Sequence, residues 1–262
     1  MENRIDKAFM ERKRPILIPY ITCGDPSLEK TESLILALEK AGAGIIELGI
    51  PFSDPIADGP VIQEACNRAL KQGMSLRKAI SFVGNLRKKT EIPIVFLSYY
   101  NPIYKYGLSN FAQDAKIAGI DGLIVPDLPP EEGQGLKKLL LKNGICLIYL
   151  LAPTSTEKRI KMTCEESSGF IYYVSLLGVT GIRKDISETL KEEILRIKRS
   201  SNKPICVGFG ISEPSHAKEI KDLADGIIIG SKIVSLIAKN PDSPDKAVIP
   251  FVSSVLRAIK NN

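Results

Sequence analysis

Two acidic residues stand where carboxylates are uncommon, and they are the first candidates for chemistry. Glu47 interrupts the apolar run Ile45–Leu48, which predicts a buried side chain at the mouth of a folded domain. Burial without a partner is costly for a carboxylate and raises its pKa, which suits proton transfer near neutral pH. The sequence therefore predicts that Glu47 is catalytic, and the alternative is a structural ion pair.

Asp58 is the second candidate, in the loop that follows the same apolar run. Pro60 fits the first turn of a helix, so Gly59 is the expected N-cap and the Asp58 side chain has no capping role. One carboxylate in a strand and one in the next loop can flank a bound substrate from two sides. Asp58 is therefore predicted to be catalytic as well.

Glycine-rich segments follow three of the later apolar runs, at 178–181, 208–212 and 230–232. Glycine lets backbone N–H groups approach phosphate oxygens closely, because no Cβ intervenes. A short helix that opens at Gly230 and Ser231 would also present its N-terminus to an anion. Tight turns alone are the alternative interpretation. The predicted phosphate-binding residues are Gly181, Gly210, Gly230 and Ser231.

Eight short apolar runs alternate with amphipathic stretches, which predicts strands joined in parallel by right-handed crossovers. No G-x-G-x-x-G motif follows the first run, which counts against an open dinucleotide-binding sheet. We expect a parallel (β/α)8 TIM barrel with an extra N-terminal helix and a short helix after strand 8, forming a single domain over residues 1–262. The predicted strands are Ile16–Ile21, Ile45–Leu48, Ile92–Leu97, Gly122–Val125, Ile145–Leu150, Phe170–Ser175, Pro204–Val207 and Gly226–Ile229.

Four helices between these runs are predicted from their periodicity and their ends. One is expected to end at Gly42 and another at Asn143 and Gly144, while Ser187 is expected to cap the start of a third. These helices are predicted to span Leu28–Ala41, Glu131–Lys142, Thr156–Ser168 and Ser187–Arg199.

The composition excludes several classes of protein. The 262 residues carry a net charge of +6, but the basic residues are spread over the chain and form no stripe for nucleic acid. Five cysteines without a C-x-x-C pair indicate free thiols in a reducing cytosol, and a single histidine, His216, argues against a metal site. The first 14 residues lack an apolar run and no segment reaches membrane-spanning length, so we expect a cytoplasmic protein.

The missing residue types also restrict the chemistry. A Schiff-base aldolase needs a lysine on a barrel strand, and none of the eight predicted strands contains one. A metal-dependent aldolase or epimerase usually needs several histidines. Acid–base chemistry by carboxylates remains, on a substrate that supplies its own electron sink.

The run from Glu47 to Pro60, E-L-G-I-P-F-S-D-P-I-A-D-G-P, resembles the signature of the tryptophan synthase α subunit. The resemblance extends along the whole chain. It includes the segment 19–26, the G-V-T-G run at 178–181, the V-G-F-G-I-S run at 207–212, and Gly230 with Ser231.

This resemblance implies a lyase that cleaves indole-3-glycerol phosphate to indole and glyceraldehyde 3-phosphate. It implies that Glu47 handles the protons at indole C3 and at the neighbouring hydroxyl, while Asp58 binds the indole N–H. Thr180 is expected to meet Asp58 when its loop closes. The expected residues of the indole pocket are Tyr172, whose neighbour Tyr173 must face the other way, Leu97, and Tyr20 at a position where the family commonly has phenylalanine.

The same resemblance implies a partner, a pyridoxal-phosphate-dependent β subunit in an α2β2 heterotetramer that receives the indole. No metal and no cofactor of its own is expected in this chain. The segments 98–104 and 127–130 are expected to face the β subunit.

Two other functions stay open at this point. One is a non-catalytic activator of the β subunit, favoured by the apolar pair Leu176–Leu177 in the loop after the sixth predicted strand. The other is a different phosphate-binding barrel enzyme, such as a sugar-phosphate epimerase.

Overall fold

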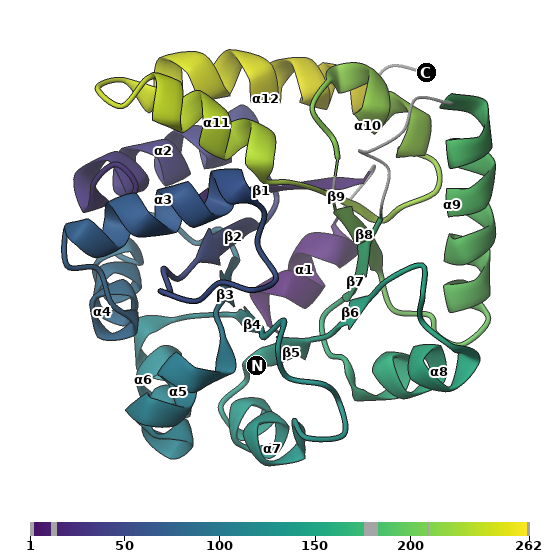
Figure 1. Ribbon diagram of the computed structural model, residues 1–262, viewed down its shortest axis with the longest axis horizontal. Helices are drawn as coiled ribbons and strands as arrows, with labels where there is room; N and C mark the ends of the chain where they lie inside the picture. Colours follow the sequence, from purple (N-terminus) through teal and green to yellow (C-terminus); the bar gives the residue numbers. More distant parts are fainter. Residues whose placement is uncertain (1–2, 12–14, 176–182, 209, 261–262) are drawn as a thin grey trace.

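Parallel strands that follow one another along the chain form a closed barrel (Figure 1). The computed structural model describes residues 3–11, 15–175, 183–208 and 210–260, with only the backbone described for 183–187. Within these residues the strands pair in the order β5-β4-β3-β2-β1-β9-β8-β7-β6. The strands are β1 (Ile16–Thr22), β2 (Ile46–Gly49), β3 (Ile94–Leu97), β4 (Gly122–Ile124), β5 (Cys146–Ile148), β6 (Leu150–Leu151), β7 (Ile171–Val174), β8 (Ile205–Gly208) and β9 (Gly226–Ile229).

The two ends of this order, β5 and β6, are consecutive parts of one run that Tyr149 separates. β5 pairs with β4 and β6 pairs with β7, so the fifth barrel position closes the ring by changing partner along its length. The expected (β/α)8 barrel is thereby confirmed, and the single fifth strand predicted from the sequence is two short strands.

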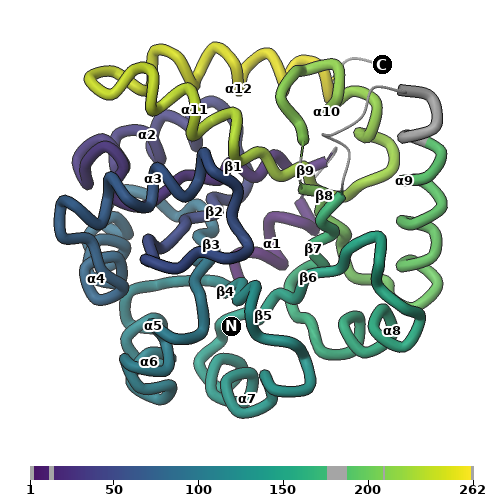
Figure 2. The backbone as a smooth tube through the Cα atoms, viewed as in Figure 1, coloured from purple at the N-terminus to yellow at the C-terminus, as the bar shows by residue number. Residues whose placement is uncertain are grey.

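Helices surround the barrel, and Figure 2 shows the chain passing once around the ring from α2 to α12. α12 packs beside α2, which brings the late part of the chain against the early part. The helices are α1 (Arg4–Met10), α2 (Leu28–Ala41), α3 (Pro60–Lys71), α4 (Leu76–Leu86), α5 (Tyr100–Tyr106), α6 (Leu108–Ala118), α7 (Gln134–Lys142), α8 (Glu157–Glu166), α9 (Arg183–Lys198), α10 (Pro214–Ile220), α11 (Ser231–Lys239) and α12 (Pro244–Lys260). The extra N-terminal helix and the short helix after the last strand are both present, as α1 and α11.

Capping residues in the sequence predicted some helix ends correctly and others wrongly. α2 has the predicted bounds, because the Ser27 hydroxyl caps its start and Gly42 ends it at φ 107°. α9 already runs from Arg183, so the prediction that Ser187 begins the helix was wrong; serine is tolerated inside helices, and its presence is a weak start signal. α7 begins at Gln134 instead of Glu131, because the N–H groups of Glu132 and Gly133 both bond to Pro129 in a preceding turn.

Alternation along the strands decides which side chains face the barrel interior. Ile46 and Leu48 of β2 belong to the core between barrel and helices, and Ile45 belongs to the core inside the barrel. Glu47, between Ile46 and Leu48, therefore points inward, and the parallel register sets it level with Tyr20 of β1. On β7 the same alternation places Tyr172 against the inner core and Tyr173 in the outer core, as predicted.

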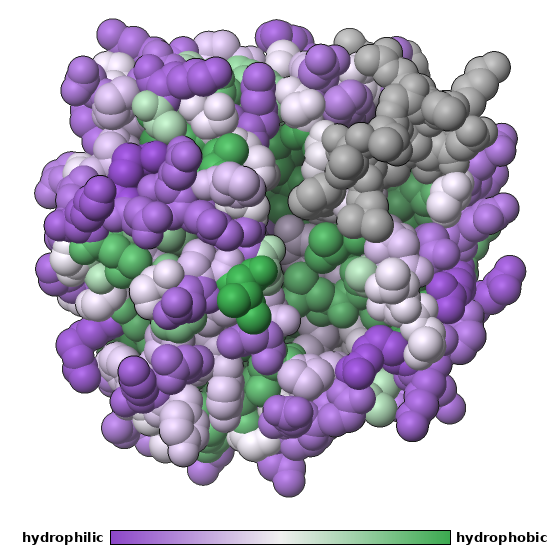
Figure 3. Space-filling model, in the orientation of Figure 1, coloured by the Kyte–Doolittle hydropathy of each residue, from purple (hydrophilic) through white to green (hydrophobic). Residues whose placement is uncertain are grey.

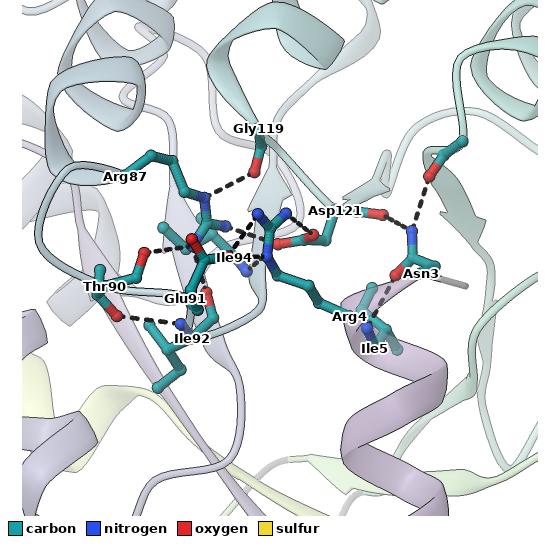
Figure 4. Close-up of polar contacts among 11 residues, drawn as sticks. Asn3, Arg4, Ile5, Arg87, Thr90, Glu91, Ile92, Ile94, Gly119 and Asp121 are labelled. Carbon is teal, nitrogen blue, oxygen red and sulfur yellow. Dashed lines mark hydrogen bonds and ion pairs between the residues drawn. The ribbon is translucent and has the colours of Figure 1, made fainter. Parts of the chain in front are cut away.

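The amino-terminal end of the barrel is filled by α1, whose Ile5 and Phe9 join the inner core. A polar cluster fixes this helix (Figure 4). Asp121 lies at its centre and accepts hydrogen bonds from Arg87 at 2.6 Å and from Arg4 at 3.0 Å. Asn3 caps α1 and also donates to the Asp121 carbonyl oxygen at 2.9 Å. Because α1 fills this end of the barrel, we expect the ligand site at the carboxyl ends of the strands.

None of the helices in the described part of the chain combines the length and the apolar character needed to cross a bilayer.

Candidate active site

A cavity of about 450 Å³ lies at the carboxyl ends of the strands, where barrel enzymes hold their substrates. Figure 3 views this face, with hydrophilic residues around the rim and hydrophobic residues beside a hollow near the centre. Eight of the ten residues predicted for the site line this cavity. They are Tyr20, Glu47, Asp58, Leu97, Tyr172, Gly210, Gly230 and Ser231.

The other two predicted residues, Thr180 and Gly181, lie outside the described residues. A larger depression of about 690 Å³ lies at the amino-terminal end of β1 and is bordered by charged side chains of α1, such as Arg4 and Lys7. Residues at that end of a barrel serve stability, and the carboxylate pair is absent from its lining.

Glu47 is the most deeply placed ionisable group of the cavity, with 1% of its surface exposed. Its Oε2 atom has no hydrogen-bond partner among the described residues. Burial, and then the negative charge of Asp58, raise the pKa of Glu47 to about 8. A carboxyl group in this state is protonated at neutral pH and can exchange its proton with a ligand.

Asp58 lies half-buried in loop 2, which we define as residues 50–59 between β2 and α3. Gly59 is the N-cap of α3 and Pro60 opens the helix, as predicted, so the Asp58 side chain does no capping. One carboxylate oxygen, Oδ2, accepts a hydrogen bond from the Tyr99 hydroxyl at 3.1 Å. Burial raises the pKa of Asp58, and the bond from Tyr99 opposes that rise.

Two tyrosines form walls of the cavity by lying across a glycine of the neighbouring strand. A Cβ on Gly49 would come within 2.1 Å of the Tyr20 hydroxyl, and one on Gly208 within 2.5 Å of the Tyr172 ring. The two glycines therefore let the rings lie flat against the strands and leave space between them. Burial raises the pKa of both phenols, so they remain neutral.

The segments that follow β8 and β9 bring backbone N–H groups to the cavity, where they can bind an anion. Gly210 has φ 73°, a left-handed conformation that favours glycine, and Gly230 precedes the nine-residue helix α11. The first N–H groups of α11, at Ser231 and Lys232, have no partner within the helix and favour negative charge. The placement is the one expected for a phosphate group, and the role of these residues stays a prediction.

Sequence reasoning missed several residues of this cavity. Ile62, Pro126, Leu150 and Val174 line it, but an apolar residue at a strand end gives no signal that separates it from core. Tyr99 was missed as the partner of Asp58, because 41 residues separate them. Lys232 also lines the cavity and was not predicted as a site residue, although its place beside Ser231 could have indicated a cation near the anion site.

No group of three or more His, Cys, Asp or Glu side chains in the described part of the chain has the arrangement of a metal site.

The barrel and its cavity define the class: a (β/α)8-barrel enzyme with its site at the carboxyl ends of the strands. The sequence model of the tryptophan synthase alpha chain matches residues 7–260. The chain therefore belongs to the tryptophan synthase alpha chain family, whose members are lyases of tryptophan biosynthesis.

Individual relatives agree with this assignment. The alpha chain of Thermoanaerobacter sp. strain X514 is 49% identical over 258 residues, which is 97% of this chain and 98% of the relative. A crystal structure of the alpha subunit from Legionella pneumophila strain Paris superposes with a TM-score of 0.92 at 40% identity, covering both chains completely. The alpha subunit in a structure of the Pyrococcus furiosus α2β2 complex gives a TM-score of 0.87 at 41% identity, covering 94% of this chain and 99% of that one.

Proposed function

We propose that this chain cleaves indole-3-glycerol phosphate to indole and glyceraldehyde 3-phosphate by a retro-aldol reaction. The observation that carries the proposal is the cavity itself, which is lined by two acidic side chains, Glu47 and Asp58, and by the glycine-rich N-terminus of α11. This arrangement suits a flat aromatic ring at one end and a phosphate at the other.

Glu47 supplies the proton that starts the reaction. With a pKa of about 8, its carboxyl group is protonated at neutral pH and delivers a proton to indole C3. The ring becomes an indolenine cation, whose C=N bond accepts the electron pair of the C–C bond that breaks between C3 and the glycerol carbon. The Glu47 carboxylate then takes the proton of the hydroxyl on that carbon, which becomes the aldehyde of glyceraldehyde 3-phosphate.

Asp58 stabilises the charged intermediate. Its carboxylate accepts a hydrogen bond from the indole N–H, where positive charge develops after C3 is protonated. The apolar walls contributed by Tyr20, Leu97 and Tyr172 exclude water around the ring and strengthen this interaction.

The phosphate is bound by the N–H groups at Gly210, Gly230 and Ser231, at the N-terminus of α11. Gly181 is proposed as a further phosphate ligand and Thr180 as a contact of Asp58, both on the loop after β7. Binding energy from the phosphate end, remote from the bond that breaks, holds C3 beside Glu47.

The partner is a β subunit that carries pyridoxal phosphate and converts indole to tryptophan. The Pyrococcus furiosus relative forms an α2β2 complex, and we assign the same assembly to this chain. Tyr104, in the segment 98–104 that is expected to face the β subunit, is 64% exposed, and Ile56 of loop 2 is 83% exposed. Exposed aromatic and apolar groups of this kind suit a protein interface.

We also propose that residues 1–262 act as one catalytic domain and that the enzyme is cytoplasmic. The packing of α12 against α2 supports the first point, because helices from the early and the late part of the chain lie together in the layer around the barrel. All five cysteines are buried and none forms a disulfide, which suits a reducing compartment.

The test is indole release from indole-3-glycerol phosphate by the purified chain, measured alone and with its β subunit. The proposal predicts release in both cases, with the rate in the complex at least equal to the rate alone. A non-catalytic activator would instead stimulate the β reaction and release no indole. Turnover of a pentulose phosphate in place of the indole substrate would indicate a different barrel enzyme.

A further inference from the structure

A single tyrosine ties loop 2 to the strand beside it. Tyr99 follows β3, is 2% exposed, and packs its ring against Phe52 of loop 2 with 5.3 Å between ring centroids. Its hydroxyl oxygen lies 2.9 Å from the Ala57 nitrogen and 3.1 Å from Asp58 Oδ2. Tyr99 thus contacts both the backbone of loop 2 and the carboxylate that this loop carries.

The direction of these two hydrogen bonds follows from the number of protons available. A phenol has one proton to donate and two lone pairs to accept with. Because the Ala57 N–H can only donate, it occupies a lone pair of the Tyr99 oxygen, and the phenol proton is left for Asp58. When Asp58 is ionised, the bond from Tyr99 becomes a charge-assisted bond, which favours the ionised form of the carboxylate.

The second oxygen of Asp58 is left for a ligand. Within the described residues, the other hydrogen bonds of Asp58 are made by its backbone: its N–H donates to Pro55, and its carbonyl oxygen accepts from Gln63. A carboxylate fixed at Oδ2 presents Oδ1 in one orientation, so little reorganisation is needed when the substrate binds.

Tyr99 is itself held in place. It is the N-cap residue of α5, and the next N–H, at Tyr100, donates to Asp127 at 2.9 Å. Asp127 belongs to the loop after β4, so the backbone beside the tyrosine is held by a neighbouring loop. A residue supported in this way transmits a fixed geometry to its partner.

We propose that Tyr99 is a positioning residue of this enzyme: its hydroxyl holds one oxygen of Asp58 as an ionised acceptor and turns the other toward the ring N–H of the substrate. This inference rests on the proposed function and adds a residue that acts through Asp58 without touching the reacting atoms.

The Tyr99 hydroxyl counteracts the effect of burial on the pKa of Asp58. Burial raises the pKa of Asp58, and the hydrogen bond from Tyr99 lowers it. Loss of the hydroxyl removes the lowering contribution, so Asp58 becomes protonated at a higher pH. The titratable or charged groups that share the site with Asp58 are Glu47 of β2, Tyr20 of β1, Cys66 of α3, Tyr172 of β7 and Lys232 of α11.

The test is Tyr99→Phe, which keeps the ring and its contact with Phe52 and deletes only the hydroxyl. The matched control is Tyr106→Phe, which deletes another phenol-to-carboxylate bond, 2.5 Å to Asp114, away from the cavity. Indole release from indole-3-glycerol phosphate is measured as kcat and KM against pH. We expect kcat of Y99F to fall by roughly 10- to 100-fold, the range for a lost hydrogen bond to a charged group.

Two further readouts distinguish positioning from folding. KM should change by less than about 3-fold, because the lost interaction acts mainly in the transition state. The acid limb of kcat/KM, which requires ionised Asp58, should move to higher pH, and its position does not depend on how much of the sample is folded. Y106F should leave kcat and the acid limb as in the wild type.

Several results would overturn the inference. They are a Y99F enzyme with unchanged kcat and acid limb, a rise in KM alone, and a variant that fails to fold, which would make Tyr99 a structural residue. In an Asp58→Asn background, Y99F should have no further effect on kcat, and an additive loss would also count against it. If the wild-type chain releases no indole, the proposed function fails instead, independently of Tyr99.

Discussion

Glu47→Gln is expected to abolish catalysis and to change how the stability of the chain depends on pH. The folded protein raises the pKa of Glu47 from 4.5 to about 8, because the carboxyl group is buried without a partner for Oε2. Between these values the folded state binds a proton that the unfolded chain has released. Stability from this group is therefore present below the unfolded pKa and is lost as pH rises through the folded pKa.

The magnitude follows from the two pKa values. Each pH unit in this window changes the free energy of unfolding by about 1.36 kcal/mol for a group that is protonated only when folded. From about pH 5.5 to about pH 9, wild type should lose on the order of 3 kcal/mol that E47Q retains, because glutamine resembles the neutral acid and does not titrate. Catalysis by E47Q should fall by at least about 100-fold, since no proton can be delivered to the substrate.

The assay is urea unfolding of both proteins across this pH range, with free energies compared between the variants at each pH. Groups other than Glu47 titrate in both proteins and cancel in the difference. Glu219→Gln, an exposed glutamate on α10, is the matched control and should follow wild type at every pH. Parallel pH dependences for wild type and E47Q would refute the reasoning, because Glu47 would then titrate alike in the folded and unfolded states.

Three further predictions concern other parts of the molecule. Asp58→Asn should lower kcat by at least about 100-fold by removing the charge that stabilises the protonated ring, and normal turnover would exclude this role. Gly208→Ala places a Cβ 2.5 Å from the Tyr172 ring, so the ring must move into the cavity. We expect KM to rise by about 10-fold, within the usual cost of overpacking, as initial rates would measure. Asp121→Asn leaves Arg87, whose side chain is 10% exposed, without its charge partner. It should destabilise the chain by about 3 kcal/mol in urea unfolding, while kcat per folded molecule stays unchanged.

Much of the fold could be read from local pattern, because a parallel barrel is built from short-range units. Buried strands appear as apolar runs, and helices begin and end at residues with particular backbone preferences, as Ser27 and Gly42 do for α2. The same local signals failed where neighbours in space decide the outcome. Ser187 lies inside α9, and the fifth strand divides at Tyr149 where the barrel changes pairing partner.

Glu47, Asp58 and the glycines at the strand ends could be predicted as a site from sequence, because a carboxylate within an apolar run and glycines after apolar runs are unusual enough to indicate chemistry. How the carboxylates are held depends on the folded arrangement. The bond from Tyr99 to Asp58 joins residues 41 positions apart in the sequence. The bond from Arg4 to Asp121, which holds α1 at the amino-terminal end of the barrel, joins residues 117 positions apart. Such contacts depend on barrel closure, which brings distant strands side by side, and no local spacing records which partners will meet.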